Sequence, residues 1–491
     1  MIIRPLHLKD GYKTDHARQY PEGTEYVYSN LTPRMSRVKG VDSVVFFSLQ
    51  FFLIEHLQHD WNTYFFNKPK EVVISAYKRR MDNYLGPDSI TMEDVSALHD
   101  LGYLPLRIKA LDEGTLVPMG IPCLTIVNTV KDFFWLTNSL ESIMSNSLWK
   151  GITSATTAFQ YRKRFEEHCK KTGYDKSFVQ WQGHDFSFRG MSGLTDAVTS
   201  GAGHLLSFTG TDTIPAIDFL EDYYLADSDK ELIGGSVPAT EHSVMCMGSE
   251  EAEIDTFKRL ITKIYPKGIV SIVSDTWDFW KVMTEYLPAL KEEILARDGR
   301  VVIRPDSGDP VKIICGDHES PHAMITEAQR KGAYELLWDI FGGTINDKGY
   351  KVLNPKVGLI YGDSITLERQ DQILNLLEEK GFSASNLVLG IGSYTYEYVT
   401  RDTFGFAMKA TWGQINGVPK DIFKNPKTDS GFKKSAKGLL KVYHDGTTLK
   451  LKDNCTPEEE QEGLLKTVFL NGDLTNYQSL SEIRARVLGQ I

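Results

Sequence analysis

The sequence predicts an α/β protein whose larger part is a β/α barrel, preceded by an α+β unit over residues 1–145. From about residue 178 onward, short apolar runs each end in a polar or glycine cluster, and a helical pattern usually follows. Most of these ends lie roughly 30 residues apart, the length of one strand–helix unit. Polar residues follow nearly every run, as expected where the loops after parallel strands share one face of a barrel.

Seven apolar runs give the order of the predicted strands. They end near Asp185, Asp212, His242, Asp275, Asp306, Asp363 and Gly392. The interval from Asp306 to Asp363 is about twice the others, which leaves room for an inserted segment. A doubly wound open sheet also alternates strands with helices, but it gathers reactive groups mainly at one switch point. We therefore favour the barrel.

Residues 1–145 mix two kinds of pattern. Residues 56–68 and 93–103 have helical periodicity, whereas residues 104–111 and 123–130 are rich in the residues typical of strands. The most apolar run, residues 44–54, is well short of the ~20 residues that cross a membrane. We interpret it as a buried helix or interface.

Charge and cysteine usage exclude several classes of protein. The 491 residues contain 55 Lys+Arg and 65 Asp+Glu, a net charge of −10, so a nucleic-acid-binding protein is not expected. The 5 cysteines form no C-x-x-C pair, which argues against a disulfide framework or a zinc ribbon. The N-terminus lacks the apolar core of a signal peptide, so we expect a cytoplasmic protein with no membrane partner.

Four stretches that resemble functional motifs are interpreted as structural. Residues 318–322 spell H-E-x-x-H, but Pro321 interrupts the helix that this zinc motif requires. Residues 390–392 read G-I-G without the third glycine of a dinucleotide-binding loop. The acids of residues 218–222 have the spacing of a solvated helix face. The lysine-rich residues 420–441 are interpreted as a solvated loop, with phosphate contact as the alternative.

The predicted strand ends have the residue types that bind a phosphorylated sugar. Arginine makes two-pronged contacts with phosphate, carboxylates hold Mg²⁺ or ribose hydroxyls, and glycine lets backbone amides approach phosphate closely. These types occur as Arg189, Arg304, Asp275, Asp306, Asp363, Gly308, Gly362, Gly392 and His242. The R-P-D-S-G turn that begins at Arg304 is the most specific local element.

The sequence also resembles the type II phosphoribosyltransferase family, nearly from end to end. The matching blocks are KDGYKTDHARQYP, GHDFSFRG, FTGTDT, SVPATEHS, VSDTWD, IRPDSGDP, YGDS, VTRD and VFLNGDL. The resemblance is to the branch that uses nicotinamide. It implies an enzyme of NAD salvage that makes nicotinamide mononucleotide and pyrophosphate from nicotinamide and phosphoribosyl pyrophosphate.

The resemblance further implies a domain plan and an assembly. An irregular β/α barrel over residues 146–399 would be the catalytic domain. A second α+β domain would combine residues 1–145 with residues 400–491. The enzyme would work as a homodimer with shared active sites.

The resemblance places the pyridine ring by motif. Phe186 would stack on one face and the partner subunit's Tyr12 on the other, since offset stacking suits a flat ligand. Asp212 would accept a hydrogen bond from the carboxamide NH₂, which a carboxylate substrate lacks, and would repel that carboxylate. Without the resemblance, Asp212 fits equally well as a cap in a Gly-Thr-Asp-Thr turn.

The phosphoribosyl donor is placed in the same way. Arg189 and Arg304 would bind phosphate or pyrophosphate oxygens, and Asp306 the ribose hydroxyls. The ribose and phosphate region of the nucleotide would contact Gly362, Asp363, Gly392 and Ser393. Further phosphate contacts, several of them across the dimer interface, are expected from Asp10, Lys13, Arg34, Arg401 and Lys409, with Lys424 and Lys433 as additional cations.

His242 is the residue with the largest consequence, because the resemblance implies that ATP phosphorylates it and that the phosphoenzyme favours product. Glu241 or Asp275 would fix its tautomer. We expect Mg²⁺ as cofactor, held mainly through substrate phosphates, and ATP as co-substrate. Two alternatives stay open: a nicotinate phosphoribosyltransferase, and a noncatalytic binding protein on this fold.

Overall fold

The computed structural model describes residues 3–423 and 436–491, which form two compact units. The first unit comprises Met1–Thr156, Phe219–Ala226 and Val399–Gln490. The second, the barrel unit, comprises Thr157–Asp218 and Asp227–Tyr398. Residues 146–156 and 219–226, which the sequence analysis assigned to the barrel domain, group by contact with the first unit.

The first unit is built on an antiparallel sheet that combines strands from both ends of the chain. Its order is β15-β14-β1-β5-β3-β18-β19. The two ends of the chain meet where β1 pairs with β14, with Ser29 opposite Ala410. The strands are β1 (Thr24–Thr32), β3 (Leu106–Ala110), β5 (Leu124–Asn128), β14 (Ala407–Ile415), β15 (Val418–Asp421), β18 (Lys466–Leu470) and β19 (Asp473–Leu474), with the separate pairs β2 (Ser43–Val45) and β4 (Leu116–Pro118), and β16 (Leu439–His444) and β17 (Leu449–Cys455).

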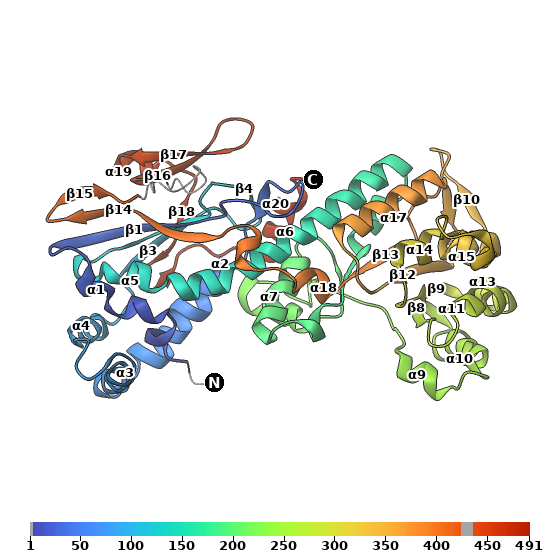
Figure 1. Cartoon of the computed structure of the whole chain (residues 1–491), viewed down its shortest axis with the longest axis horizontal. Helices are drawn as coiled ribbons and strands as arrows, with labels where there is room; N and C mark the ends of the chain where they lie inside the picture. The colour runs from blue at the N-terminus through green and yellow to red at the C-terminus, as the bar shows by residue number, and fades with distance from the viewer. Residues whose placement is uncertain (1–2, 424–435) are drawn as a thin grey trace. The chain divides into compact units, whose positions relative to one another are not determined.

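Helices complete the first unit (Figure 1). They are α1 (His16–Gln19), α2 (Leu49–Phe51), α3 (Lys70–Leu85), α4 (Glu93–Leu101), α5 (Trp135–Ser139), α19 (Pro457–Gln461) and α20 (Leu480–Leu488), with the first half of α6 (Glu141–Thr172). The predicted buried run, residues 44–54, forms the end of β2, α2 and the start of a π-helix, and its apolar residues up to Leu53 are buried. Phe51 packs on Phe219 and Phe47 on Tyr224, at ring distances of 4.9 and 5.0 Å, which explains why the end of α8 (Pro215–Tyr224) belongs to this unit.

The barrel unit has parallel strands whose spatial order is their order in the chain. The strands are β6 (Gly183–Asp185), β7 (Gly210–Thr211), β8 (Lys267–Val273), β9 (Asp298–Arg304), β12 (Val357–Tyr361) and β13 (Leu387–Ile391), paired in the order β7-β6-β13-β12-β9-β8. The extended segment 235–239 closes the ring, because Gly235 bridges to Gly210 and Ala239 bridges to Ser271. The predicted barrel is therefore confirmed, and the open sheet is not formed.

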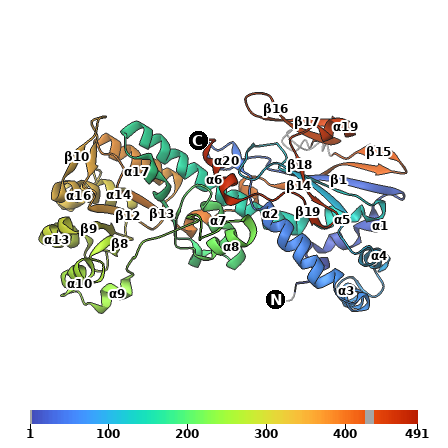
Figure 2. The same ribbon diagram turned by 180° about the vertical axis from the view of Figure 1, so that it is seen from behind.

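Helices surround these strands, as Figures 1 and 2 show for α14 and α17. The helices of the unit are α7 (Leu194–His204), α9 (His242–Met247), α10 (Glu253–Arg259), α11 (Phe279–Lys281), α12 (Leu287–Ala289), α13 (Lys291–Ala296), α14 (Pro310–Cys315), α15 (Glu327–Lys331), α16 (Ala333–Phe341), α17 (Leu367–Glu379) and α18 (Ser393–Tyr396), with the second half of α6. The long interval after Asp306 holds α14 to α16 and the hairpin of β10 (Gly343–Ile345) and β11 (Lys351–Leu353), so the predicted insertion is confirmed.

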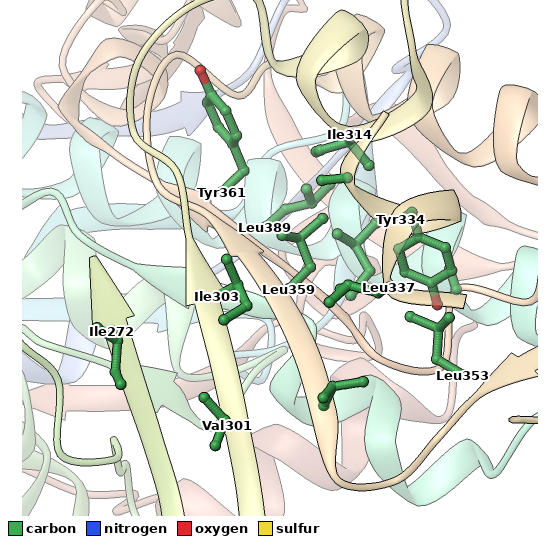
Figure 3. Close-up of a cluster of buried hydrophobic side chains, with 14 of the residues drawn as sticks. Ile272, Val301, Ile303, Ile314, Tyr334, Leu337, Leu353, Leu359, Tyr361 and Leu389 are labelled. Atoms are coloured by element: carbon green, nitrogen blue, oxygen red, sulfur yellow. The ribbon is translucent and has the colours of Figure 1, made fainter. Parts of the chain in front are cut away.

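Alternation along the strands divides their side chains between a core and a cavity. Val301 and Ile303 on β9 are buried among Leu359, Leu337 of α16 and Ile314 of α14 (Figure 3). Successive residues of a strand point to opposite faces. The residues between them therefore face the interior of the ring, where they line the cavity described below.

Two other motifs have the structures expected of them, whereas the lysine-rich stretch is not a loop at its ends, since Lys420 lies on β15 and Lys441 on β16. His318 and Glu319 lie outside any helix, and a short 3₁₀ turn begins at His322, so H-E-x-x-H forms no zinc helix. Asp218, Glu221 and Asp222 are exposed on α8. The 5 cysteines are all free. In the described parts of the chain, no helix has both the length and the apolarity that crossing a bilayer requires.

We expect Leu359→Ala to lower the free energy of unfolding of the barrel unit by about 2–5 kcal/mol, because it leaves a hole in a fully buried cluster. Urea denaturation followed by circular dichroism measures the change. Ile345→Ala is the matched control: this side chain is 59% exposed, and its loss should change stability by less than about 0.5 kcal/mol. Equal effects from both variants would contradict the core assignment.

Candidate active site

The interior of the barrel unit contains a cavity of about 640 Å³. Its walls are the inward residues of the strands, among them Val302 on β9, Gly358 and Ile360 on β12, and Val388 on β13. At the carboxyl ends of the strands the lining becomes polar and aromatic. His184, Phe186, Asp212, Ser236 and Arg304 meet there.

Two glycines position the Phe186 ring. A Cβ added to Gly390 on β13 would lie 2.5 Å from Phe186 Cδ2, and one added to Gly362 after β12 would lie 3.4 Å from Cε2. The Phe186 amide donates to the carbonyl of Ile391 at 3.0 Å, which extends the β6–β13 pairing by one residue. The ring therefore lies against bare backbone and faces the cavity, where it can stack on a flat ligand.

Asp212 follows β7 at the same end of the cavity. Its Oδ1 accepts hydrogen bonds from His184 Nε2 and from Ser236 Oγ, each at 2.8 Å. Partial burial by itself raises the pKa of this carboxyl, but the bonds from His184 and Ser236 and the charge of Arg304 lower the pKa below its ordinary value. Asp212 is thus an ionised acceptor beside the cavity.

Arg304 and Asp306 lie at the end of β9, with Asp275 after β8. Arg304 donates to the carbonyl of Thr240 at 2.6 Å, and its Nε lies 3.4 Å from Asp306 Oδ2. Asp275 Oδ2 accepts from the Asp306 amide at 3.0 Å and from Ser307 Oγ at 2.5 Å. These bonds hold the R-P-D-S-G turn against the neighbouring strand end.

Two polar atoms of this cluster have no hydrogen-bond partner although they are buried. They are Arg304 Nε and Asp306 Oδ1. Burial raises the pKa of Asp306, and Asp275 adds to the rise, while the charge of Arg304 opposes it. Buried polar atoms in folded proteins are nearly always satisfied, so unsatisfied ones beside a cavity indicate a place for a ligand. A cation near Asp306 or a hydroxyl bonded to it would satisfy this carboxyl.

His242 is the first residue of α9, shortly after the extended segment 235–239 that closes the barrel. Its side chain is 49% exposed, and Nε2 lies 3.2 Å from Asp275 Oδ1. Of the two partners considered from the sequence, Asp275 is therefore the one that contacts the imidazole. Glu241 instead accepts a hydrogen bond from Ser243.

The remaining predicted residues of the barrel unit lie at the same strand ends but are more exposed. Gly362 approaches Asp306, since a Cβ there would lie 2.9 Å from Oδ1. Asp363 is exposed and accepts from Ser364 Oγ at 3.0 Å. Gly392 precedes α18 and Ser393 is its first residue. Arg189 is exposed and does not line the cavity.

The first unit gathers a second group of predicted residues. Asp10, Tyr12 and Arg401 line one cavity of about 480 Å³ together with Glu141 and Trp149. The Tyr12 ring is 66% exposed. An exposed aromatic ring beside charged groups can add to a site built by another chain.

Three other cations of this unit do not line this cavity. Lys13 is buried and forms an ion pair with Glu141 at 2.6 Å. Arg34 Nε donates to the carbonyl of Gly405 at 2.9 Å. Lys409 is exposed on β14. Lys424 and Lys433 lie outside the described residues.

Sequence reasoning missed His184, Ser236 and the carbonyl of Thr240. The signal for His184 was present, because it stands two residues before Phe186 and alternate residues of a strand share a face. Ser236 and Thr240 carried no such signal. They belong to a short extended stretch whose pairing depends on the closed ring.

Two family models match the chain. Residues 181–473 match the Nicotinate phosphoribosyltransferase (NAPRTase) family, and residues 5–98 match the domain described as Nicotinamide phosphoribosyltransferase, N-terminal domain. The chain belongs to the nicotinate phosphoribosyltransferase family.

Relatives within the family carry a more specific name. A protein of Acinetobacter baylyi called nicotinamide phosphoribosyltransferase is 56% identical over 500 residues, covering 100% of this chain and 98% of the relative. A Xanthomonas campestris protein of the same name is 32% identical, covering 97% and 96%. Among solved structures, nicotinate-nucleotide pyrophosphorylase from Pyrococcus furiosus matches with a TM-score of 0.59 at 14% identity, covering 98% of this chain and 94% of that one. The likeness to that structure shows the fold.

We expect Gly390→Ala to destabilise the barrel unit by about 1–3 kcal/mol, because its Cβ would overlap the Phe186 ring and force it to move. Gly392→Ala is the matched control, since a Cβ there meets nothing within 4 Å. Thermal unfolding of both variants measures the difference. Equal stability of the two variants would contradict the close packing of the Phe186 ring against Gly390.

Proposed function

We propose that this protein transfers the phosphoribosyl group of phosphoribosyl pyrophosphate to nicotinamide, forming nicotinamide mononucleotide and pyrophosphate in NAD salvage. The observation that supports it best is the ionised Asp212 beside Phe186, at the same end of the barrel as Arg304 and Asp306. The carboxyl ends of the barrel strands, here called the rim, therefore offer an aromatic face, a carboxylate that can accept a hydrogen bond from an amide, and a cation. The names of the relatives point to the same reaction.

The ring substrate would stack on Phe186, with its carboxamide directed toward the Asp212 carboxylate. The carboxamide NH₂ of nicotinamide has two donors for Asp212, whereas the carboxylate of nicotinate has none and carries a like charge. A site built to accept a hydrogen bond from the substrate discriminates against an analogue that lacks the donor. The position of Asp212 thus favours nicotinamide over the alternative of a nicotinate-specific enzyme.

The donor would bind with its ribose near Asp306 and its pyrophosphate near Arg304. The pyridine nitrogen attacks C1 of the ribose, the C1–N bond forms, and the C1–O bond to pyrophosphate breaks. The ring nitrogen is already a free nucleophile, so no general base is needed. Catalysis would come from positioning and from cations that stabilise the departing pyrophosphate. Arg189, Asp363, Gly392 and Ser393 would complete the phosphate contacts.

The rim also fits a magnesium ion. Asp275, Asp306 and Asp363 supply the oxygen ligands that Mg²⁺ prefers. Among the described residues, the group of three acidic or histidine donors close enough to hold a metal is Glu55, His59 and Asp60 in the first unit, not one at the rim. Mg²⁺ at the rim would therefore share its coordination with substrate phosphates. When bound, it would neutralise charge on pyrophosphate.

His242 would be phosphorylated by ATP. Asp275 accepts from Nε2, which leaves the Nδ1 lone pair for attack on the terminal phosphorus, with ADP as leaving group. The phosphoenzyme and its hydrolysis would couple ATP to product formation. The half-exposed position of His242 leaves the imidazole accessible to a nucleotide.

A homodimer would complete the site. The partner subunit's Tyr12 would cover the second face of the pyridine ring, and Asp10, Lys13, Arg34, Arg401 and Lys409 would reach the phosphates, with Lys424 and Lys433 in support. The exposed Tyr12 ring and its cavity with Asp10 and Arg401 support this assignment. We propose that the reaction takes place in the cytoplasm.

The deciding experiment offers nicotinamide or nicotinate separately with phosphoribosyl pyrophosphate and Mg²⁺, with and without ATP, and measures the mononucleotides by mass spectrometry. We expect product from nicotinamide only, increased by ATP. Product from nicotinate only would overturn the assignment of Asp212. No product from either would favour a noncatalytic binding protein.

We expect Arg304→Ala to lower kcat/KM by an amount equivalent to about 2–4 kcal/mol, because it removes a cation that faces the leaving group. Steady-state kinetics measure the loss. Arg259→Ala is the matched control, since Arg259 is an exposed arginine of the same unit on α10 and should leave kcat/KM unchanged. A near-wild-type rate for Arg304→Ala would reject its role.

We expect His242→Ala to make the rates with and without ATP equal while product still forms at the basal rate, because the phosphate acceptor is lost and the rim is otherwise intact. Initial rates measured with and without ATP test this. A mass increase of one phosphate on the wild-type protein, absent from the variant, provides the control. ATP stimulation that survives in the variant would contradict the assignment.

A further inference from the structure

His184 is confined by its surroundings. It lies on β6 two residues before Phe186, and its side chain is 10% exposed. Its ring centroid is 4.6 Å from that of Phe186. On the neighbouring strand β7, a Cβ at Gly210 would lie 2.7 Å from His184 Nδ1, so glycine is what leaves room for the imidazole. The ring is therefore held between an aromatic side chain and bare backbone.

The contacts of Asp212 are one-sided. His184 Nε2 and Ser236 Oγ both donate to Oδ1, at 2.8 Å each. Within residues 3–423 and 436–491, no group donates a hydrogen bond to Oδ2. An ionised carboxylate is an acceptor only, so His184 must carry its proton on Nε2 in this contact. Oδ1 thus anchors the carboxylate, and Oδ2 is left for a ligand.

We infer that His184 is a positioning residue that sets the choice between carboxamide and carboxylate substrates by holding the Asp212 carboxylate in a fixed orientation. The inference rests on the proposed function and assigns to that site a specificity determinant outside the ring-stacking and phosphate contacts. His184 acts through Asp212 and needs no contact with the substrate carboxamide.

The selectivity follows from what each anchor does to Asp212. Two hydrogen bonds to Oδ1 fix the direction in which Oδ2 points. Without His184, the carboxylate keeps only the Ser236 anchor and is free to rotate. Oδ2 then no longer faces the carboxamide, and the negative charge can turn away from the carboxylate of nicotinate. Loss of His184 therefore weakens the binding of nicotinamide and lowers the discrimination against nicotinate.

The test compares His184→Ala and His184→Gln with wild type in the intact chain. We measure kcat and KM with each of the two ring substrates, and dissociation constants for nicotinamide and nicotinate by calorimetry. We expect His184→Ala to raise the KM for nicotinamide about 10-fold while kcat changes less, and to lower the preference for nicotinamide over nicotinate by a similar factor. His184→Gln should restore most of the preference, because its amide nitrogen reaches the position of Nε2.

His318→Gln is the matched control, an exposed histidine of the same unit that should leave the substrate preference unchanged. Equal losses for both ring substrates in His184→Ala, with no rescue by glutamine, would show a merely structural role and overturn the inference. If wild type makes neither mononucleotide, the proposed function fails. In that case the dissociation constants still test the role of His184. Equal affinity of wild type and His184→Ala for nicotinamide would reject that role.

Discussion

Closure of the barrel by residues 235–240 is the constraint on which the rest of the site depends. This stretch is too short to be a strand of its own, yet Thr211 donates to the carbonyl of Gly235 and Ser271 donates to that of Pro238. Both edges of the parallel sheet are thereby satisfied, and seven strand ends open onto one rim. The same stretch supplies Ser236 to Asp212 and the Thr240 carbonyl to Arg304. One piece of backbone thus closes the fold and holds both Asp212 and Arg304 at the same end of the barrel.

The hollow interior follows from the choice of inward residues. Outward positions such as Val301, Ile303 and Leu359 carry the apolar bulk that packs on the helices. Inward positions include Gly358. At the rim, Gly362 and Gly390 have no side chain, so only their backbone borders the Phe186 ring. A barrel of this size is ordinarily filled by its own side chains. Here small inward residues leave a cavity, and Phe186 uses part of the space they leave.

Much of this could be predicted from the sequence, because it depends on local pattern. The apolar runs and the polar residues after them located every strand of the barrel and the extended segment before His242. They also located the insertion after Asp306. The pairing of His184 with Asp212 could not be predicted, since it depends on the orientation of two side chains at the ends of neighbouring strands. The same holds for residues 219–226, whose aromatic rings pack on Phe47 and Phe51 far away in sequence. For His242, the sequence left two carboxylates open, and only the fold selects Asp275.

The pairing of β1 with β14 has a consequence for how the chain is made. Strand β1 leaves the ribosome early, but one of its edges bonds only to residues 407–415. Domains fold largely as units during synthesis, and contacts between distant residues form slowly. The strands of the barrel are all synthesised before β14, and until β14 is made β1 has an open edge of the kind that promotes association between chains. The sheet of the first unit therefore depends on the last fifth of the chain, and a nascent chain that ends before β14 contains every barrel strand but lacks part of that sheet.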